Sequence, residues 1–196
     1  MSQTLQSLVD AACFLAGSDG LEKDVIGELL VPRVVYHVAR RAARDEKRRA
    51  LVTTTTSIAL MNGNVALPAT VLVEFMHLAA VENPADATMA RKMRWIPSWA
   101  EFVRPLENTL GYFTVTQPSV VSQFYMTLPG ASYAPGAGYT GSISLTVPQV
   151  PAIPSTPTGA FNVPGEIEDD VVLYLTAALK GDWLQLIQTE NPKADQ

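Results

Sequence analysis

The chain has 196 residues, of which 47% are hydrophobic and 17% are charged, and its formal net charge is −5. This length allows one domain, or a domain with an insert, that can bury a core without disulfide bonds. The single cysteine, Cys13, excludes an internal disulfide, and the acidic balance excludes a general attraction for nucleic acid.

Neither a leader peptide nor a membrane helix is predicted. Residues 1–17 lack a basic start and contain Asp10 within their apolar stretch, so we expect no signal peptide. A membrane helix needs a run of about 18 apolar residues, which the sequence does not contain. We therefore expect a protein that is made in the cytoplasm and makes no contact with a membrane.

The first fifty residues predict two helices. Apolar residues at helical spacing predict a helix over 4–16, which Gly17 ends. A second helix is predicted over about 19–50, with acidic residues near its start and basic residues at its end, as the helix dipole favours. Its apolar residues cover more than one stripe, which predicts burial on two sides. Pro32 should kink or split this helix.

The middle of the chain predicts strands and loops. The β-branched run 52–60 predicts a strand, and Asn62-Gly63 predicts a hairpin turn because both turn positions require positive φ. We expect a short helix leading into a strand over 71–80, strands over 93–102, 112–116, 120–128 and 142–147, a long loop over 129–141, and a proline-rich extended connector over 148–165.

A final helix is predicted over 166–180. Acidic residues at its start and Lys180-Gly181 at its end suit the helix dipole and a glycine C-cap. The predicted fold class is α+β: a helical bundle body, made of the two N-terminal helices and the C-terminal helix (1–50 and 166–190), with a large β-rich domain (51–165) inserted into it. Residues 191–196 are predicted to form a mobile C-terminal tail.

Motifs that would indicate catalysis occur in the wrong context. Residues 136–141 match G-x-G-x-x-G, but a nucleotide site needs a strand before this motif and a helix after it. The two histidines, His37 and His77, have no cysteine or second histidine at ligand spacing. The acidic group at 166–170 lacks the calcium-loop pattern, and helix capping accounts for it. We therefore expect no enzyme activity, no catalytic residue, no metal and no cofactor.

Two features are candidates for docking a partner. Six basic residues lie within 40–49, and Arg40, Arg44 and Arg48 have the i, i+4, i+8 spacing of one helix face. This face is interpreted either as a solvated surface, helped by the neighbouring acidic residues, or as a docking site for an acidic protein surface or a neighbouring subunit. The loop tyrosines are the second feature. The candidate docking residues are Arg40, Arg41, Arg44, Lys47, Arg48, Arg49, Tyr133 and Tyr139.

Two stretches of sequence resemble the head-to-tail adaptor (connector) proteins of tailed phages. After the long predicted helix come a β-run TTTTSIAL (53–60), a turn and LP segment NGNVALP (62–68), and VLVE (71–74). The segment IEDDVVLYLTAAL (167–179) is similar to the late helix of that family, which rejoins the N-terminal helices. LGYF (110–113) and the strands after it fit the β-rich insert of larger members. The basic cluster and the Gly/Tyr loop depart from the family's pattern.

The resemblance implies a structural virion protein of the neck, assembled in the host cytoplasm. Members of the family form homo-oligomeric rings, typically twelvefold, beneath the portal protein, and they join the portal to the tail. The implied partners are other copies of the chain, the portal protein and a tail or nozzle protein. Genomic DNA would pass through the lumen without specific binding, which suits an acidic chain.

Two other functions remain open at this point. The first is a different structural part of the neck or tail, such as a terminator, nozzle or baseplate subunit. The second is a β-rich ligand-binding or enzymatic domain that uses Trp95, Trp99 and Tyr112 as the walls of a pocket. Core packing is the alternative interpretation of these three aromatic residues.

Overall fold

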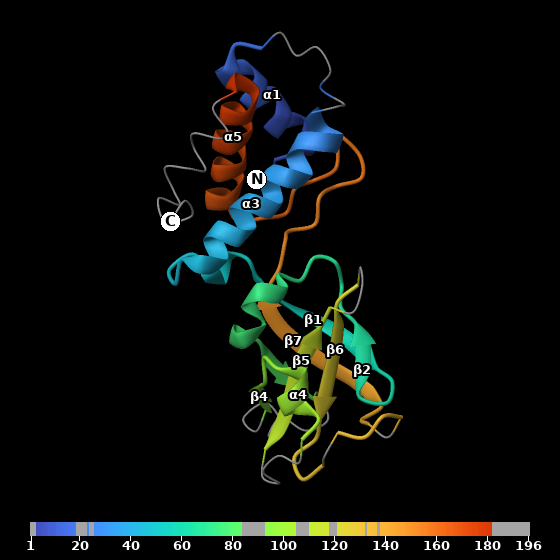
Figure 1. Ribbon diagram of the computed structural model, residues 1–196. Helices are drawn as coiled ribbons and strands as arrows, with labels where there is room; N and C mark the ends of the chain where they lie inside the picture. The colour runs from blue at the N-terminus through green and yellow to red at the C-terminus, as the bar shows by residue number, and fades with distance from the viewer. Residues whose placement is uncertain are drawn as a thin grey trace. The chain divides into compact units, whose positions relative to one another are not determined.

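A computed structural model shows that the chain is of mixed α and β structure, as predicted (Figure 1). It describes residues 3–18, 23, 26–83, 93–104, 110–117, 121–131, 133–136 and 138–181. The chain divides into two compact units. Unit 1 comprises Met1–Val52 and Val150–Gln196, and unit 2 comprises Thr53–Gln149.

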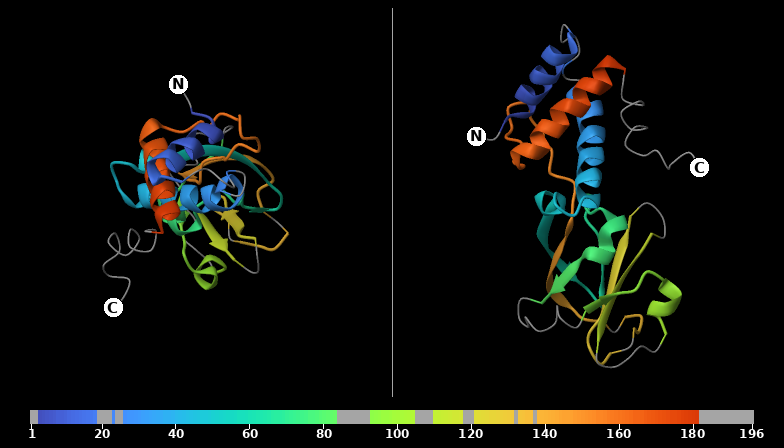
Figure 2. Two further views of the ribbon diagram at one scale, coloured as in Figure 1. Left: turned by 90° about the horizontal axis from the view of Figure 1, so that it is seen from above. Right: turned by 90° about the vertical axis from the view of Figure 1, so that its left-hand side faces the viewer.

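Unit 1 contains helices from both ends of the chain. They are α1 (Leu5–Ala16), the π-helical turn η1 (Ile26–Leu30), α3 (Val31–Arg44), the 3-10 turn η2 (Arg49–Leu51) and α5 (Gly165–Lys180). Helix α5 packs against both α1 and α3 (Figure 2). The core of this unit includes the fully buried side chains of Leu8, Val35, Val38, Phe161, Ile167, Val171, Tyr174 and Leu175.

Helix α1 confirms the prediction for residues 4–16. Thr4 caps its start, because the Thr4 hydroxyl accepts a hydrogen bond from the Ser7 N–H and the Ser7 hydroxyl accepts one from the Thr4 N–H. Gly17 ends it in the left-handed conformation, at φ 68°. Cys13 is buried on the apolar face of the helix.

The second predicted helix is not broken at Pro32. It changes from the π-helical turn η1 to the α-helix α3 between Leu30 and Val31, one residue before the proline. The prediction that this helix is buried on two sides is wrong for α3. Its buried residues fall on one stripe, while Tyr36 on the opposite face is 45% exposed.

The predicted end of this helix at Ala50 is also wrong, because α3 ends at Arg44. Asp45 is extended (φ −83°, ψ 118°), and its carboxylate accepts a hydrogen bond of 2.9 Å from the Lys47 N–H. This local bond from side chain to backbone competes with the helical bonds, and the helix ends nearly two turns before the predicted residue. Lys47 and Arg48 therefore lie in a turn, and Arg49 lies in η2.

Helix α5 confirms the last predicted helix, and Gly181 caps its end. The proline-rich connector before it lies along the start of α1. The Leu5 N–H donates to the Gly159 carbonyl (3.1 Å), the Gln6 N–H to the Pro157 carbonyl (2.8 Å), and the Phe161 N–H to the Gln3 carbonyl (2.8 Å). The connector is thus an ordered part of unit 1. The predicted tail, residues 191–196, lies outside the described residues.

Unit 2 contains two sheets. The three-stranded sheet has the order β1-β7-β3, is antiparallel, and is formed by Thr53–Leu60, Gly141–Pro148 and Ala80–Glu82. The four-stranded sheet has the order β2-β6-β5-β4 and is formed by Asn64–Ala66, Gln123–Thr127, Gly111–Thr116 and Met93–Trp95. Only the β4–β5 pair of this sheet is parallel. The 3-10 helix η3 (Val73–Leu78) and the short helix α4 (Trp99–Phe102) complete the described elements of unit 2.

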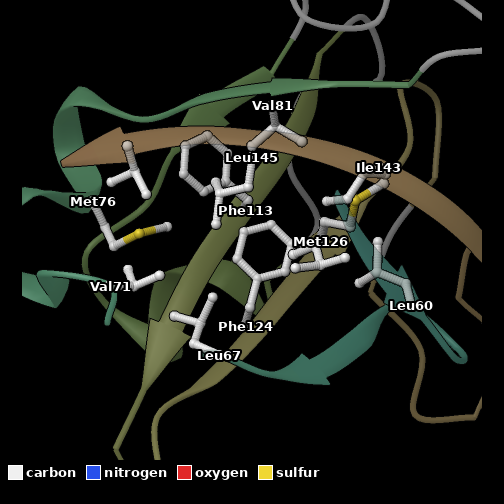
Figure 3. Packing of buried hydrophobic residues seen from close by; sticks show 12 residues of the cluster. Leu60, Leu67, Val71, Met76, Val81, Phe113, Phe124, Met126, Ile143 and Leu145 are labelled. Carbon is white, nitrogen blue, oxygen red and sulfur yellow. The ribbon is translucent and has the colours of Figure 1, made fainter. Parts of the chain in front are cut away.

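The two sheets share one hydrophobic core (Figure 3). Ile143, Leu145 and Val147 alternate along β7 and are fully buried, as the sequence predicted. Phe113, Phe124 and Met126 enter the core from β5 and β6. Side chains from both sheets therefore fill the space between them, as in face-to-face sheet packing.

The predicted hairpin at Asn62-Gly63 is only partly correct. The turn is present, with φ of 53° at Asn62 and 77° at Gly63, and Met61 and Asn64 exchange backbone hydrogen bonds of 3.1 and 3.2 Å. The strands on either side of the turn separate, because β1 pairs with β7 over eight residues while β2 pairs with β6. The turn therefore carries the chain from one sheet into the other.

Most of the other predicted elements of unit 2 are confirmed. The helix and strand of 71–80 correspond to η3 and β3, and the strands predicted over 112–116, 120–128 and 142–147 correspond to β5, β6 and β7. The predicted strand over 93–102 is wrong after Trp95. Pro97 has no N–H to donate to a sheet, and the chain forms α4 from Trp99 instead.

The loop between β6 and β7 accounts for the apparent nucleotide-binding motif. A Cβ at Gly138 would lie 2.4 Å from the carbonyl carbon and oxygen of Asn62. The Gly63 N–H donates to the Tyr139 carbonyl (2.8 Å), and the Met126 N–H donates to the Gly63 carbonyl (2.8 Å). The motif glycine thus allows the loop backbone to lie directly on the Asn62-Gly63 turn.

We predict that Gly138→Ala lowers the free energy of unfolding by about 1–3 kcal/mol, because its Cβ would push the turn away from the loop. Gly165→Ala is the matched control, since a Cβ there would meet no atom within 4 Å. Urea denaturation of both variants measures the difference. Equal stability of the two variants would show that the close approach at Gly138 does not constrain the fold.

Candidate functional site

The basic cluster does not form one helix face, contrary to the prediction. Arg40 and Arg44 lie on α3, but Arg48 lies beyond its end, in the turn before η2. The i, i+4, i+8 spacing therefore does not align these three side chains. The contacts of each basic residue decide which of them can meet a partner.

Arg41 is exposed, and its guanidinium contacts α5. Its Nη1 donates a hydrogen bond to the hydroxyl of Tyr174 on α5, and its guanidinium carbon lies 5.6 Å from the centre of the Tyr174 ring. The ring of His37, one turn earlier on α3, lies with its centre 5.0 Å from that of Tyr174. Tyr174 is fully buried. Two polar residues of α3 thus hold the central aromatic residue of α5.

Arg48 is engaged with the acidic start of α5. Its Nη2 lies 2.7 Å from Oδ2 of Asp170, and its Nε lies 3.9 Å from Oε2 of Glu166. Nη2 also donates to the Glu166 carbonyl (3.3 Å). The side chains of Arg48 and Asp170 are 23% and 18% exposed, so solvent screens this pair only partly.

The acidic residues at the start of α5 do not cap the helix as predicted, because its N-cap is Pro164 and no side chain makes a capping hydrogen bond; they contact other segments instead. Glu166 and Asp170 contact Arg48, and the Glu168 carboxylate accepts a hydrogen bond of 3.2 Å from the Gln3 N–H. The sequence contained the signal for this pairing, namely a basic cluster at 40–49 and an acidic cluster at 166–170. The sequence does not predict that these two clusters pair, because sequence spacing does not show which distant segments meet.

The remaining basic residues differ in exposure. Arg49 Nε donates to the Ala43 carbonyl (2.9 Å), so this side chain closes the end of α3. Arg40 is half-buried. Arg44 and Lys47 are exposed. Of the predicted docking residues in unit 1, Arg44 and Lys47 are thus best placed to meet a partner.

Tyr133 and Tyr139 lie in unit 2, so the candidate docking residues are divided between the two units. Tyr133 joins an aromatic cluster that sequence reasoning missed, formed by Trp99, Phe102, Tyr125 and Tyr133. Its ring centre lies 5.2 Å from that of Trp99, 5.3 Å from that of Phe102 and 6.0 Å from that of Tyr125. Burial raises the pKa of Tyr133. Tyr139 packs against the core of unit 2.

Each unit contains a cavity. A cavity of about 230 Å³ in unit 2 is lined by Tyr133 and Tyr139 among other residues. One of about 470 Å³ in unit 1 is lined by apolar and polar residues, and Lys23 and Glu28 are among the latter. Lys23 pairs with Asp10, and the hydrogen bonds from Lys23 and Gln6 lower the pKa of Asp10, while the same pairing raises the pKa of Lys23. Neither cavity contains a nucleophile paired with a base among its described lining residues.

The aromatic residues proposed as pocket walls have other roles. Tyr112 is buried within β5, and Trp95 packs on Phe113 with ring centres 5.5 Å apart. Trp99 belongs to the aromatic cluster and is 39% exposed. The three residues line neither of the two cavities. Core packing therefore accounts for Tyr112 and Trp95.

The described residues contain no group of three or more His, Cys, Asp and Glu side chains that could hold a metal ion. Within the same residues, no helix is long and apolar enough to cross a membrane. No protein-family model matches the chain, and no curated protein matches it either.

We predict that Arg48→Gln lowers the free energy of unfolding by about 1–3 kcal/mol, because it leaves the partly buried Asp170 carboxylate without its cation. Lys47→Gln removes the neighbouring exposed charge and should change stability by less than about 0.5 kcal/mol. Chemical denaturation of the two variants measures both effects. A neutral Arg48→Gln would show that the ion pair does not fasten α5 to the end of α3.

Proposed function

We propose that this chain is the subunit of a phage head-to-tail adaptor ring, which joins the portal to the tail and lets DNA pass. One observation carries the proposal. The segments on either side of unit 2 both belong to unit 1, and unit 2 is inserted between Val52 and Val150. The order of helices, β-rich insert and late returning helix is the order that the sequence resemblance implies. In this proposal unit 1 is a helical bundle body and unit 2 is the β-rich insert.

The internal contacts of unit 1 support a role in assembly. A ring closes only when each subunit presents its contact surfaces at a fixed angle. The Arg41–Tyr174 and Arg48–Asp170 contacts fix the last helix to α3, so unit 1 can serve as a rigid building block. The polar residues of the basic cluster are thus used to hold the fold together, as expected for a structural protein.

The negative net charge of the chain supports a channel through which DNA passes without being bound. The chain carries a net charge of −5, and a ring of such subunits would repel the phosphate backbone unless it presented a basic lumen. Exposed Arg44 and Lys47 would instead meet an acidic surface of the portal or of a tail protein. Tyr133 and Tyr139 would supply a second contact from unit 2.

We predict that the purified full-length chain forms a ring, typically twelvefold, either alone or on its portal protein, because the proposed function requires a closed assembly. Native mass spectrometry and negative-stain electron microscopy measure the ring. A chain that stays monomeric even with its portal would contradict the proposal. A map of the intact particle that places the chain further down the tail would favour a terminator, nozzle or baseplate subunit instead.

We also predict that the double variant Arg44→Glu, Lys47→Glu weakens portal binding by roughly tenfold or more, since it places like charges against an acidic surface. Arg94→Glu is the matched control, because Arg94 is an exposed arginine of β4 in unit 2. Surface plasmon resonance at two salt concentrations measures the effect. Unchanged binding by the double variant would show that α3 and the turn after it do not contact the portal.

A further inference from the structure

Unit 1 exposes a pair of large apolar side chains at the end of its first helix. Phe14 is 84% exposed and its neighbour Leu15 is 55% exposed. Both lie in the last turn of α1, before the Gly17 cap, and the only charged residue of this helix is Asp10. Single apolar side chains are common on protein surfaces, so the pair becomes informative only through a surface that it fits.

The cavity of about 470 Å³ in unit 1 offers such a surface. It lies between the start of α1, the segment formed by η1 and the first turn of α3, and the proline-rich connector, which runs along the start of α1 (Figure 2). Its volume falls within the roughly 300–1,000 Å³ of sites that enclose a small ligand, so it has room for a phenyl group. The apolar lining residues are Leu5, Val9, Pro32, Ile153, Pro154 and Pro157.

The half-buried polar side chains of this cavity are already bonded. The Gln6 amide and the Lys23 ammonium both donate hydrogen bonds to Oδ1 of Asp10. The other polar lining side chains are exposed, namely Glu28, Ser155 and Thr156. Leu5 and Val9, in contrast, are buried. The cavity therefore has an apolar floor and a polar rim, which is the composition of a site for an apolar side chain of a protein.

The exposed pair and the cavity lie on opposite sides of α1. At about 100° per residue, Leu5, Gln6 and Val9 project into the cavity within an arc of about 100°. Phe14 and Leu15 project from the opposite side, each about 80° outside an end of that arc. The pair therefore does not fill the cavity of its own copy. A contact between opposite sides of two copies is head-to-tail, and its repetition closes a ring or extends a filament.

We propose that Phe14 and Leu15 of one copy enter the unit 1 cavity of the next copy, and that this contact repeats around the adaptor ring. The inference rests on the proposed function, because a cyclic ring requires a head-to-tail contact between its subunits. A buried aromatic side chain removes roughly 150–250 Å² from water. Pro32, at the cavity, lies about 18 Å along α3 from Arg44, so this contact and the proposed portal contact use different ends of the helix.

A second copy fits the cavity better than other occupants do. A small polar molecule would find unbonded polar side chains only at the rim. An apolar side chain of the portal or of a tail protein would fill the cavity, but it would leave Phe14 and Leu15 in solvent. The head-to-tail contact covers the exposed pair and fills the cavity at the same time, and one chain carries both halves of it.

Sedimentation velocity of the full-length chain over a wide concentration range tests the contact. The wild type should form species larger than twice the 21.2 kDa chain mass as its concentration rises. Phe14→Ser changes an exposed position, so it should leave the fold intact and weaken self-association by roughly tenfold or more. Leu173→Ser removes an exposed apolar side chain of α5 and is the matched control, which should assemble as the wild type does.

A second variant blocks the cavity instead of the side chain that enters it. Gly27→Phe adds a phenyl group at a lining position where a Cβ would meet no atom within 4 Å. Gly165→Phe adds the same group at the start of α5, where a Cβ also has open space, and is its control. Phe14→Ser and Gly27→Phe should each self-associate poorly alone. Mixed in equal amounts, they should form a complex of two chains and nothing larger, because one intact phenyl group meets one intact cavity.

A photo-cross-link reads the contact directly, both in solution and in an assembly formed on the portal. Phe14→p-benzoylphenylalanine should become joined to residues 153–157 of another copy, and mixing isotope-labelled with unlabelled copies identifies the product as intermolecular. The same replacement at Leu173 is the control and should give no such product. The contact is overturned by a wild type that neither self-associates nor cross-links, by a Phe14→Ser variant that assembles as the wild type does, or by a mixture that forms no two-chain complex.

The contact and the adaptor function can fail separately. The double variant Arg44→Glu, Lys47→Glu should self-associate as the wild type does while it binds the portal poorly. A chain that associates through Phe14 but binds no portal overturns the adaptor function and leaves the contact standing. A ring that forms on the portal equally well with Phe14→Ser does the reverse.

Discussion

The contact between α5 and the end of α3 closes unit 1 across a long stretch of chain. Arg41 and Tyr174 are 133 positions apart, and ordering so long a connection has an entropic cost. Unit 2 lowers this cost, because β1 and β7 pair over their full length and place Thr53 opposite Pro148. The insert therefore leaves unit 1 and returns to it at neighbouring points. The returning helix is then held by its buried apolar side chains against α1 and α3, and by the Arg41 and Arg48 contacts.

Elements that depend on local interactions were predictable from the sequence. Helix α1, helix α5 and strand β7 follow from apolar periodicity with glycine caps, and the Asn62-Gly63 turn follows from its need for positive φ. The predictions that are wrong concern elements whose ends or partners are set by a hydrogen bond between distant segments, or by a bond that competes with the helix. Asp45 ended α3 early through a bond to the Lys47 N–H, and β2 paired with β6 rather than with β1. No local pattern separates a hairpin from a turn that passes between sheets.

In the candidate site, too, local features were predictable from the sequence and contacts between distant segments were not. The sequence located the basic cluster, but a list of charges does not reveal which of them are already neutralised within the fold. Arg48 is held by Asp170, and Arg41, although exposed, contacts Tyr174, while Arg44 and Lys47 are exposed. The aromatic cluster of unit 2 could not be predicted, since Trp99, Tyr125 and Tyr133 come from three separate segments. Trp99 lies on α4, Tyr125 on β6 and Tyr133 in the loop that follows β6.

The Asn62-Gly63 turn has a mechanical consequence for unit 2. The Gly63 N–H is bonded to the loop that leads into β7, and the Gly63 carbonyl is bonded to β6, so this one residue connects the backbones of both sheets. Force applied to one sheet would therefore reach the other through the backbone as well as through the shared core. An epitope inserted at this turn would cut that connection. The exposed loop around Pro135 and Gly136 offers a site for a label that leaves the two sheets joined.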